Sequence, residues 1–443
     1  MDLLESFLQK TAPVAASEEL GLAGTQTCER RLNGTPFILT KDPKIANYVF
    51  NDGKARTNYC LRPGEDRGLQ KLHMFENGLI WNNDTPKWKK IRGCFQKALG
   101  ANALKHASCI IQKEAEPTLT AHMEKADGKE GIDLLAICRR LTFRASLGAF
   151  FGVDSTEFAG LKVDEAAFID AIVQYFKAWE YFLIRPEQHW DKSLAKKHSQ
   201  AVSSLKGHVQ NLLKAIEMRD ASLTPSQKGS KRKLFVESLR EVCVKEPECE
   251  ELLLQSSLEM LLAGTDTSSV TAYYTLLALA GDKALQHDLR EELHNSNEEA
   301  LLRSIVDESL RFKPVGPVVL RQACQDDPNF PAGPVKKGTG ILVHLAEMNL
   351  DEEVWKEPRK FDPRRFLVPG EHKSVFFPFG EGPKGCVGMH LGRREVNSIV
   401  ATVILQYDLE IVGSETLSSL ETHWDIANQP DDPTRIRLSP VAD

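Results

Sequence analysis

A glycine-rich turn that ends in a single cysteine constrains this 443-residue chain more than any other stretch. The turn spans Phe379–Gly388 (FGEGPKGCVG), and an amphipathic run follows from Met389 to about Gln406. Glycines let a backbone turn tightly, adopt positive φ and lie close to a flat ligand. Cys386 falls at or just before the predicted helix, where unpaired N–H groups and the helix dipole stabilise a thiolate.

A thiolate in such a cage is a soft, charged axial ligand that suits haem iron. The alternative is a buried free cysteine after a glycine turn, which is the commoner explanation for a lone cysteine. The complete spacing of the turn favours the metal ligand. We therefore predict that Cys386 binds the iron of a haem.

A second candidate pair lies upstream, in a predicted helix that contains Trp88 and Arg92. Residues four apart lie on one helix face. An indole N–H and a guanidinium presented together suit an anionic carboxylate. The alternative is a core tryptophan beside a solvated arginine.

The run Glu250–Ala280 is the longest helical candidate and is apolar almost all round, which predicts a helix buried through the middle of the domain. It contains Asp266 and Thr267, an acid and a hydroxyl that need partners or a function in such a helix. We interpret them as a proton relay opposite Cys386, with Gly264 leaving room for dioxygen. The alternative is that Thr267 bonds back to the preceding turn and kinks the helix.

Composition narrows the class of protein. With 42% hydrophobic and 27% charged residues the chain is globular, and its net charge of -6 argues against a nucleic-acid binder. Nine cysteines without a pairing rhythm predict reduced thiols. No apolar run reaches the roughly 18–20 residues that span a bilayer. We find no repeat or linker, which favours one large domain.

Periodicity and capping signals predict the other elements. We expect helices at Leu3–Leu20, Ile45–Phe50, Gly131–Leu147, Ala166–Leu183, Leu194–Met218 and Leu301–Phe312, and strands at Thr35–Thr40, Val318–Arg321, Gly340–Leu345, Tyr407–Val412 and Ile436–Leu438.

Four motifs together resemble the cytochrome P450 family, over essentially the whole chain: the cysteine turn, Trp88 with Arg92, the sequence Ala263–Thr267, and Glu308 and Arg311 with the stretch Phe361–Phe366. The resemblance implies that Phe379, Lys384 and Gly388 of the cysteine turn contact the cofactor, although Lys384 stands where the family usually has arginine. The resemblance implies a mainly α fold with small β-sheets and a single domain over residues 1–443. It also implies a buried network of Glu308, Arg311 and Arg365 under the haem loop, and propionate contacts from Arg62, Trp88, Arg92 and Arg321.

Within the family the chain is most similar to the steroid aromatases of vertebrates, on stretches such as Gly78–Asn83 and Glu259–Ala263. It departs from them at Thr265, where they have proline, and at Gly316-Pro317, so other sterols and unrelated lipophiles stay open as substrates. The residues implied to line the substrate pocket are Ile80, Trp81, Phe176, Trp179, Leu262, Ala263, Val318 and Leu320. The aromatic stripe Tyr175–Phe182 is alternatively core or a membrane contact.

The resemblance implies a monooxygenase that contains haem b, receives electrons from NADPH through a separate reductase, and oxidises a small hydrophobic, steroid-like substrate. A basic patch is expected to dock the reductase, formed by Lys87, Lys89, Lys90, Lys97, Lys384 and Arg393. Two alternatives are a peroxide isomerase without a reductase and a non-catalytic haem carrier or sensor. The expected location is the cytosolic face of the endoplasmic reticulum if a membrane anchor precedes this sequence, and the cytoplasm otherwise.

Overall fold

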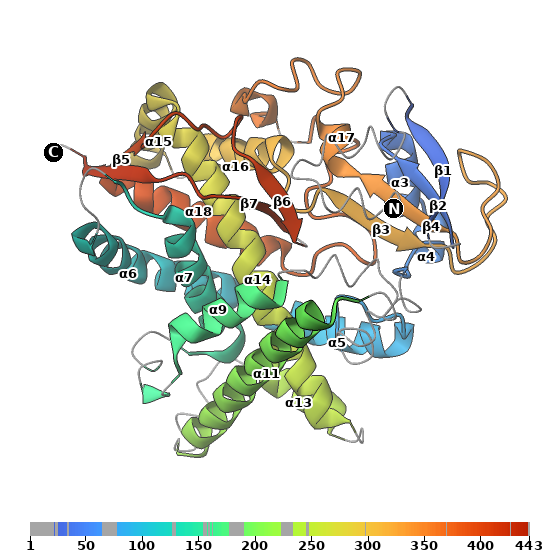
Figure 1. The fold of residues 1–443 in the computed structure, drawn as a ribbon, viewed down its shortest axis with the longest axis horizontal. Helices are drawn as coiled ribbons and strands as arrows, with labels where there is room; N and C mark the ends of the chain where they lie inside the picture. Colours follow the sequence, from blue (N-terminus) through green and yellow to red (C-terminus); the bar gives the residue numbers. More distant parts are fainter. Residues whose placement is uncertain are drawn as a thin grey trace.

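The computed structural model describes residues 22, 25–32, 35–63, 78–125, 130–153, 157, 160, 161, 163–176, 190–222, 234–244, 248–296, 298–368, 370–425 and 427–441. Helices fill most of the molecule, a four-stranded sheet lies at one side, and the long helix α14 (Cys249–Ala280) runs through the middle (Figure 1). This arrangement confirms the predicted fold class, mainly α with small sheets. The predicted helix Leu3–Leu20 and the part of Ala166–Leu183 that includes Trp179 lie outside the described residues.

The four-stranded sheet joins two segments that are far apart in the sequence. Its order is β1-β2-β4-β3, and β2 and β4 run parallel whereas the other neighbours are antiparallel. The strands are β1 (Thr27–Leu32), β2 (Thr35–Thr40), β3 (Val318–Gln322) and β4 (Gly340–His344). The predicted strands of this sheet are therefore confirmed. Two smaller antiparallel pairs are β5 (Tyr407–Ile411) with β8 (Ile436–Pro440), and β6 (Thr422–Asp425) with β7 (Ala427–Pro430).

The predicted helices within the described residues are present, with ends that differ by a few residues. In α3 (Pro43–Asn51) the first turn is set by the sequence Asp42-Pro43, because the Asp42 carboxylate accepts the Lys44 N–H and proline is favoured at the first helical position. The other helical elements are α4 (Ala55–Asn58), α5 (Thr85–Ala98), α6 (Ala101–Lys125), α7 (Leu134–Ser146), the π-helix η2 (Leu147–Phe151), α9 (Glu165–Phe176), α11 (Lys192–Ala221), α13 (Phe235–Cys243), α15 (Lys283–Asn295), α16 (Ala300–Phe312), α17 (Leu345–Asn349), the 3-10 helix η4 (Pro363–Phe366) and α18 (Met389–Gln406).

Helix α14 is the core element on which the other helices pack, including α7, α16 and α18. Because it is surrounded on every side, its sequence carries almost no polar face. Between Gln255 and Leu277 its residues are buried except for Ala263, Gly264 and Thr267, which are partly accessible. The accessible part of this helix is therefore its middle turn.

Gly264 does not have the role that we predicted for it. A Cβ at this position would lie 2.5 Å from Oγ of Ser146, at the end of α7. The glycine therefore lets α14 and α7 approach each other closely. Its missing side chain is filled by a neighbouring helix, so it leaves no groove in that direction for dioxygen.

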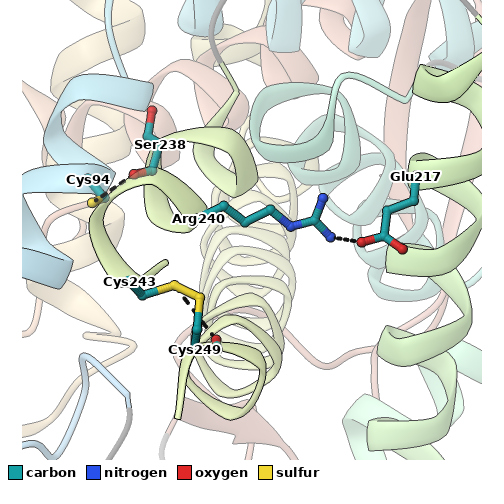
Figure 2. Close-up of a disulfide and its surroundings, with 6 residues drawn as sticks. All are labelled: Cys94, Glu217, Ser238, Arg240, Cys243 and Cys249. Atoms are coloured by element: carbon teal, nitrogen blue, oxygen red, sulfur yellow. Dashed lines mark hydrogen bonds and ion pairs between the residues drawn. A yellow bond between two sulfur atoms is a disulfide. The ribbon is translucent and has the colours of Figure 1, made fainter. Parts of the chain in front are cut away.

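Cys243, the last residue of α13, forms a disulfide with Cys249, the first residue of α14 (Figure 2). The prediction that all the cysteines are reduced is wrong for this pair. The end of α13 and the start of α14 lie close together, and the two Cα atoms, which are six residues apart in sequence, are 5.0 Å apart. Sequence spacing alone did not reveal this approach.

We expect this disulfide to stabilise the fold moderately. Closing so short a loop lowers the entropy of the unfolded chain by an amount worth about 2 kcal/mol in the chain-entropy relation. The double variant Cys243→Ser/Cys249→Ser should unfold at lower urea than the wild type, as monitored by far-UV circular dichroism. Dithiothreitol should lower the wild-type midpoint and leave that of the variant unchanged; equal responses of the two proteins would contradict the expectation.

Candidate functional site

The loop before α18 is held in a conformation that requires its glycines. The Cys386 N–H donates to the Phe379 carbonyl over 2.9 Å and closes the loop. Gly380 and Gly382 have φ values of 58° and 72°, in the left-handed region. At Gly382 a Cβ would also lie 2.2 Å from the Phe50 carbonyl oxygen. The loop therefore packs against the end of α3 and delivers Cys386 just ahead of α18, as the sequence predicts.

The Cys386 side chain lies deep in the protein and yet is accessible, because it faces a cavity of about 700 Å³. Burial raises the pKa of its thiol, while the Gly388 N–H, Arg92 and Arg62 oppose the rise. A soft metal ion bound to this sulfur would offset the effect of burial, because it favours the thiolate over the thiol.

Three arginines from separate parts of the chain lie near this loop and act on the charge of its own Lys384. They are Arg62, Arg92 and Arg321. Burial is the main reason why the pKa of Lys384 is lowered to about 7. The positive charge of Arg62 is the next largest cause. Burial also lowers the pKa of Arg62 to about 10, and Arg92 adds to that shift. The pKa of Arg321 lies well below its ordinary value for the same two reasons, burial and Arg62. These cations destabilise one another.

None of these four cations forms an ion pair within the part of the chain that the structure describes, and Nε of Arg62 is buried without a hydrogen-bond acceptor. Such a cluster is costly unless an anion compensates it. A group with two carboxylates beside a soft-metal centre matches both the cations and the Cys386 sulfur. The donor set therefore fits haem, whose propionates would be held by the cations and whose iron would be bound by Cys386.

The Trp88 side chain is arranged differently from our prediction. Its Nε1 donates to the Leu79 carbonyl over 3.1 Å, so the indole N–H is already used within the protein. Its ring contacts two cations instead: Nζ of Lys384 lies 4.0 Å and Cζ of Arg92 lies 5.4 Å from the ring centroid. Trp88 therefore orients the cations of the cluster through its ring.

The predicted network of Glu308, Arg311 and Arg365 is present. Nε and Nη2 of Arg311 each donate to a carboxylate oxygen of Glu308 over 2.7 Å, and both side chains are fully buried. Arg365 Nε lies 3.4 Å from Glu308 Oε1. The remaining donors of Arg311 bond backbone carbonyls, those of Asn349 and Pro358 at 2.8 Å and that of Lys360 at 3.3 Å. The network thus ties α16 to the segment that leads to the cysteine loop.

Asp266 and Thr267 face different partners. The Asp266 carboxylate accepts a hydrogen bond of 2.5 Å from Nε2 of Gln429 on β7. It also lies 3.7 Å from Nε of Arg139 on α7. The Thr267 hydroxyl donates to the Ala263 carbonyl over 2.8 Å, which is the back-bond that we considered as the alternative. Its oxygen can still accept a hydrogen bond at the accessible middle turn of α14.

Neither Asp266 nor Thr267 lines the cavity beside Cys386. The two regions are nevertheless adjacent, because α14 packs on α18 and a Cβ at Gly392 would lie 3.4 Å from Oγ of Ser268. Gly392 is six residues after Cys386, and Ser268 follows Thr267 directly. The helix crossing therefore brings the cysteine loop and the acid–hydroxyl pair to the same region of the fold.

The residues predicted to line a substrate pocket fall into three groups. Ala263, Ile80, Val318 and Leu320 are partly accessible, as a pocket wall requires. Leu262 is fully buried in the core, and Phe176 and Trp81 are nearly so. Trp179 lies outside the described residues. Only the first group agrees with an exposed apolar wall.

The predicted basic patch is smaller than expected. Lys384 is buried, where its Nζ donates to the Asn82 carbonyl over 2.8 Å, so it does not belong to the surface. Lys87 pairs with Glu248 at 3.1 Å, and Arg393 pairs with Asp307 at 2.6 Å. The exposed cations of α5 that remain are Lys89, Lys90 and Lys97.

Several buried polar residues of this region were not predicted. Glu259 on α14 and Glu395 on α18 are fully buried, and burial raises the pKa of their carboxyls to about 7 and about 8. A carboxylate within an apolar helical run was the available signal for Glu259. Nothing in the sequence distinguished Gln429 or Arg139, since both reach Asp266 only through the fold.

Comparison with known proteins decides the family. The sequence model of the cytochrome P450 family matches residues 25–435. The chain belongs to the cytochrome P450 family. The resemblance seen in the sequence is thereby confirmed. As a P450 the chain is a monooxygenase with haem b as cofactor, and its partners are a redox partner that supplies electrons and a small hydrophobic substrate.

Two groups of relatives stand out. Aromatase of Gallus gallus is 29% identical and that of Taeniopygia guttata 28% identical, each over 408 residues that cover 89% of this P450 and 76% of the relative. A zebrafish cytochrome P450 solved with abiraterone superposes with a TM-score of 0.77 at 19% identity, covering 97% of this chain and 100% of the other. The structural likeness supports the fold. No helix in the described part of this P450 is long and apolar enough to cross a bilayer.

Proposed function

We propose that this P450 oxidises a steroid-like substrate with dioxygen and with electrons from an NADPH-dependent reductase. The observation that carries the proposal is the position of Cys386 beside four cations that have no ion-pair partner among the described residues. This arrangement suits a metal centre whose edge carries two carboxylates. When bound, haem supplies an iron centre that the thiolate makes electron-rich for dioxygen chemistry.

The steroid-like substrate class rests on the aromatase relatives and on the apolar side chains at the partly accessible positions. Ala263 lies on the accessible turn of α14, and Ile80, Val318 and Leu320 are apolar residues of separate segments with accessible surface. Such side chains favour a rigid lipophile over a polar or charged molecule, because burying unpaired polar groups is costly.

Asp266 and Thr267 are assigned to proton delivery. Asp266 is buried but its partner Arg139 is partly exposed, so this carboxylate lies between the solvent side of α7 and the interior. Thr267 presents an oxygen that accepts a hydrogen bond at the accessible turn. Water held there by Thr267 would receive its protons from the direction of Asp266.

The reductase is proposed to approach the α5 side of the molecule. Lys89, Lys90 and Lys97 are exposed on the helix that also carries Arg92 of the cation cluster. A local positive surface on a chain of net charge -6 steers an acidic partner to one face.

The test of the proposal is a titration of the haem-loaded protein with androgens and other sterols, followed by incubation with NADPH and a P450 reductase. We expect saturable spectral shifts with a sterol, and an oxygenated product formed in step with NADPH consumption. Product formation from peroxides without NADPH would support the isomerase alternative instead. Binding without turnover of any sterol would support a carrier.

Asp266→Asn should separate proton delivery from haem binding. Asparagine keeps the size and one acceptor oxygen for Gln429, but it cannot carry a proton at neutral pH. We expect NADPH-dependent product formation to fall about 100-fold, the lower end of the range for acid–base groups. The Soret spectrum should stay unchanged. Asp408→Asn, which removes the charge of a carboxylate that pairs with Arg290 at the surface, is the matched control and should keep the wild-type rate. An equal rate in Asp266→Asn would remove the assignment.

A further inference from the structure

The segment 78–83 is held through its backbone by parts of the protein that are far apart in sequence. Trp88 Nε1 donates to the Leu79 carbonyl, and Lys384 Nζ donates to the Asn82 carbonyl. The Asn83 side chain bonds the backbone of Arg62 twice, with both distances 2.9 Å. The segment thus connects α5, the cysteine loop and the stretch that carries Arg62.

The strongest hold on this segment comes from Glu259 on α14. Its Oε2 accepts two backbone N–H groups, that of Leu79 over 2.5 Å and that of Ile80 over 2.9 Å. Its Oε1 accepts Nε2 of Gln255 over 3.1 Å. The Glu259 side chain is fully buried. A buried carboxylate that accepts several N–H groups forms stronger hydrogen bonds than a neutral acceptor.

Gly78 lies directly against the same carboxylate, in space that a side chain would need. A Cβ at this position would lie 1.7 Å from Oε1 of Glu259 and 2.3 Å from its carboxyl carbon. Any larger residue would have to displace either the segment or the Glu259 side chain. The close contact therefore requires both the Glu259 carboxylate and the absence of a side chain at Gly78.

Position on the helix connects Glu259 to the reaction site. Glu259, Ala263 and Thr267 are spaced four residues apart, so they follow one another along one face of α14. Ala263 and Thr267 form the accessible middle turn of that helix. Glu259 therefore fastens the segment about one turn from Ala263 and about two turns from Thr267, which is assigned to the reaction.

We propose that Glu259 is a positioning residue, which fixes the segment 78–83 against α14 and so places the substrate-facing Ile80 and the cation Arg62. This inference rests on the proposed function only where it calls Ile80 substrate-facing. The attachment of segment 78–83 to α14 by Glu259, which we call the clamp, does not depend on any substrate. Charge supports it: Arg62 and Glu259 attract each other, and Arg62 opposes the effect of burial, which raises the pKa of Glu259 to about 7.

Hydrogen–deuterium exchange tests the clamp without any substrate. In the wild-type protein the amides of Leu79 and Ile80 should be protected. In Glu259→Leu they lose their acceptor inside the protein, and we expect their exchange to become about 10- to 100-fold faster. In Glu259→Gln the amide oxygen can accept both N–H groups, and Gln255 can turn its own amide to pair with the new NH₂, so protection should be retained. Unchanged exchange in Glu259→Leu would overturn the proposal.

A spectral titration of the haem-loaded protein tests whether losing the clamp changes the wall of the substrate pocket. Imidazole reaches the iron with little contact to the wall, whereas 4-phenylimidazole also contacts it. We expect Glu259→Leu to lower the affinity for 4-phenylimidazole about tenfold, while the affinity for imidazole stays within a factor of two. If the affinities for both ligands fell equally, or if neither fell, a positioning role would be contradicted. Gly78→Ala, which forces the same segment away from α14 while the Glu259 carboxylate is kept, should reproduce the selective loss if Glu259→Leu does not fold.

Glu292→Leu is the matched control. The Glu292 carboxylate also accepts two backbone N–H groups, those of Leu301 and Leu302 at the start of α16, at 2.7 and 3.1 Å. This variant should lose stability like Glu259→Leu, but it should leave the exchange at Leu79 and the preference for 4-phenylimidazole unchanged. The same selective loss in the control would assign the effect to general destabilisation and overturn the proposal.

Discussion

Glu308→Ala should yield a protein without haem. The substitution leaves the fully buried guanidinium of Arg311 without its bidentate partner, and removing one member of a buried pair costs about 3–5 kcal/mol. The Asp362 N–H, which donates to Glu308 Oε1 over 2.7 Å, loses its acceptor as well. The segment between α16 and the cysteine loop then loses its anchor. The ratio of Soret to protein absorbance in purified protein measures the outcome, and Arg311→Ala should give the same result.

The control for this experiment is Asp326→Ala. It breaks the ion pair between Asp326 and Lys336 on the surface, where both side chains are largely exposed. Because surface pairs contribute little, haem content should equal that of the wild type. Normal haem content in Glu308→Ala would show that the network is not needed for the loop.

Cys386→Ser should abolish the thiolate signature and the activity together. Serine fits the loop, because the bond from the residue 386 N–H to the Phe379 carbonyl uses only the backbone. Its hydroxyl, however, stays protonated near neutral pH and is a hard, weak ligand for the iron. The reduced, carbon-monoxide-treated variant should lack the thiolate-type Soret band, and product formation should fall to background.

Cys138→Ser serves as the control, since Cys138 is a free thiol buried in α7, where burial raises its pKa far above the ordinary value. This variant should keep the thiolate band. A thiolate-type band that persists in Cys386→Ser would move the metal ligand to another cysteine and remove the basis of the proposed function.

Local pattern predicted those parts of the site whose partners are close in sequence. The spacing of Glu308 and Arg311 places both on one helix face, and the bidentate pair is present. The glycines of the cysteine loop predicted tight turns, and two of them have positive φ. Asp42-Pro43 predicted the start of α3. In each case the sequence contains both the residue and the neighbour that gives it a role.

Partners supplied by distant segments could not be read from pattern. The indole N–H of Trp88 was free to bind a carboxylate as far as the sequence shows, but the fold places the Leu79 carbonyl against it. Lys384 was predicted both to contact the cofactor and to belong to a surface patch, and the fold rules out the second role because it buries Lys384 against Asn82. Cys243 and Cys249 meet because the end of α13 lies beside the start of α14. Each of these contacts depends on tertiary placement, which no spacing rule contains.

The parallel pairing of β2 with β4 has a consequence for how the protein is made. Phe37 pairs with Gly340, and the ring of Phe37 occupies the place of the side chain that the glycine lacks. The hairpin of β1 and β2 leaves the ribosome long before its partner strand exists. At about 5–20 residues per second, the roughly 300 intervening residues take about 15–60 s to synthesise. During that interval the open edge of β2 needs protection by a chaperone or by the nascent helices.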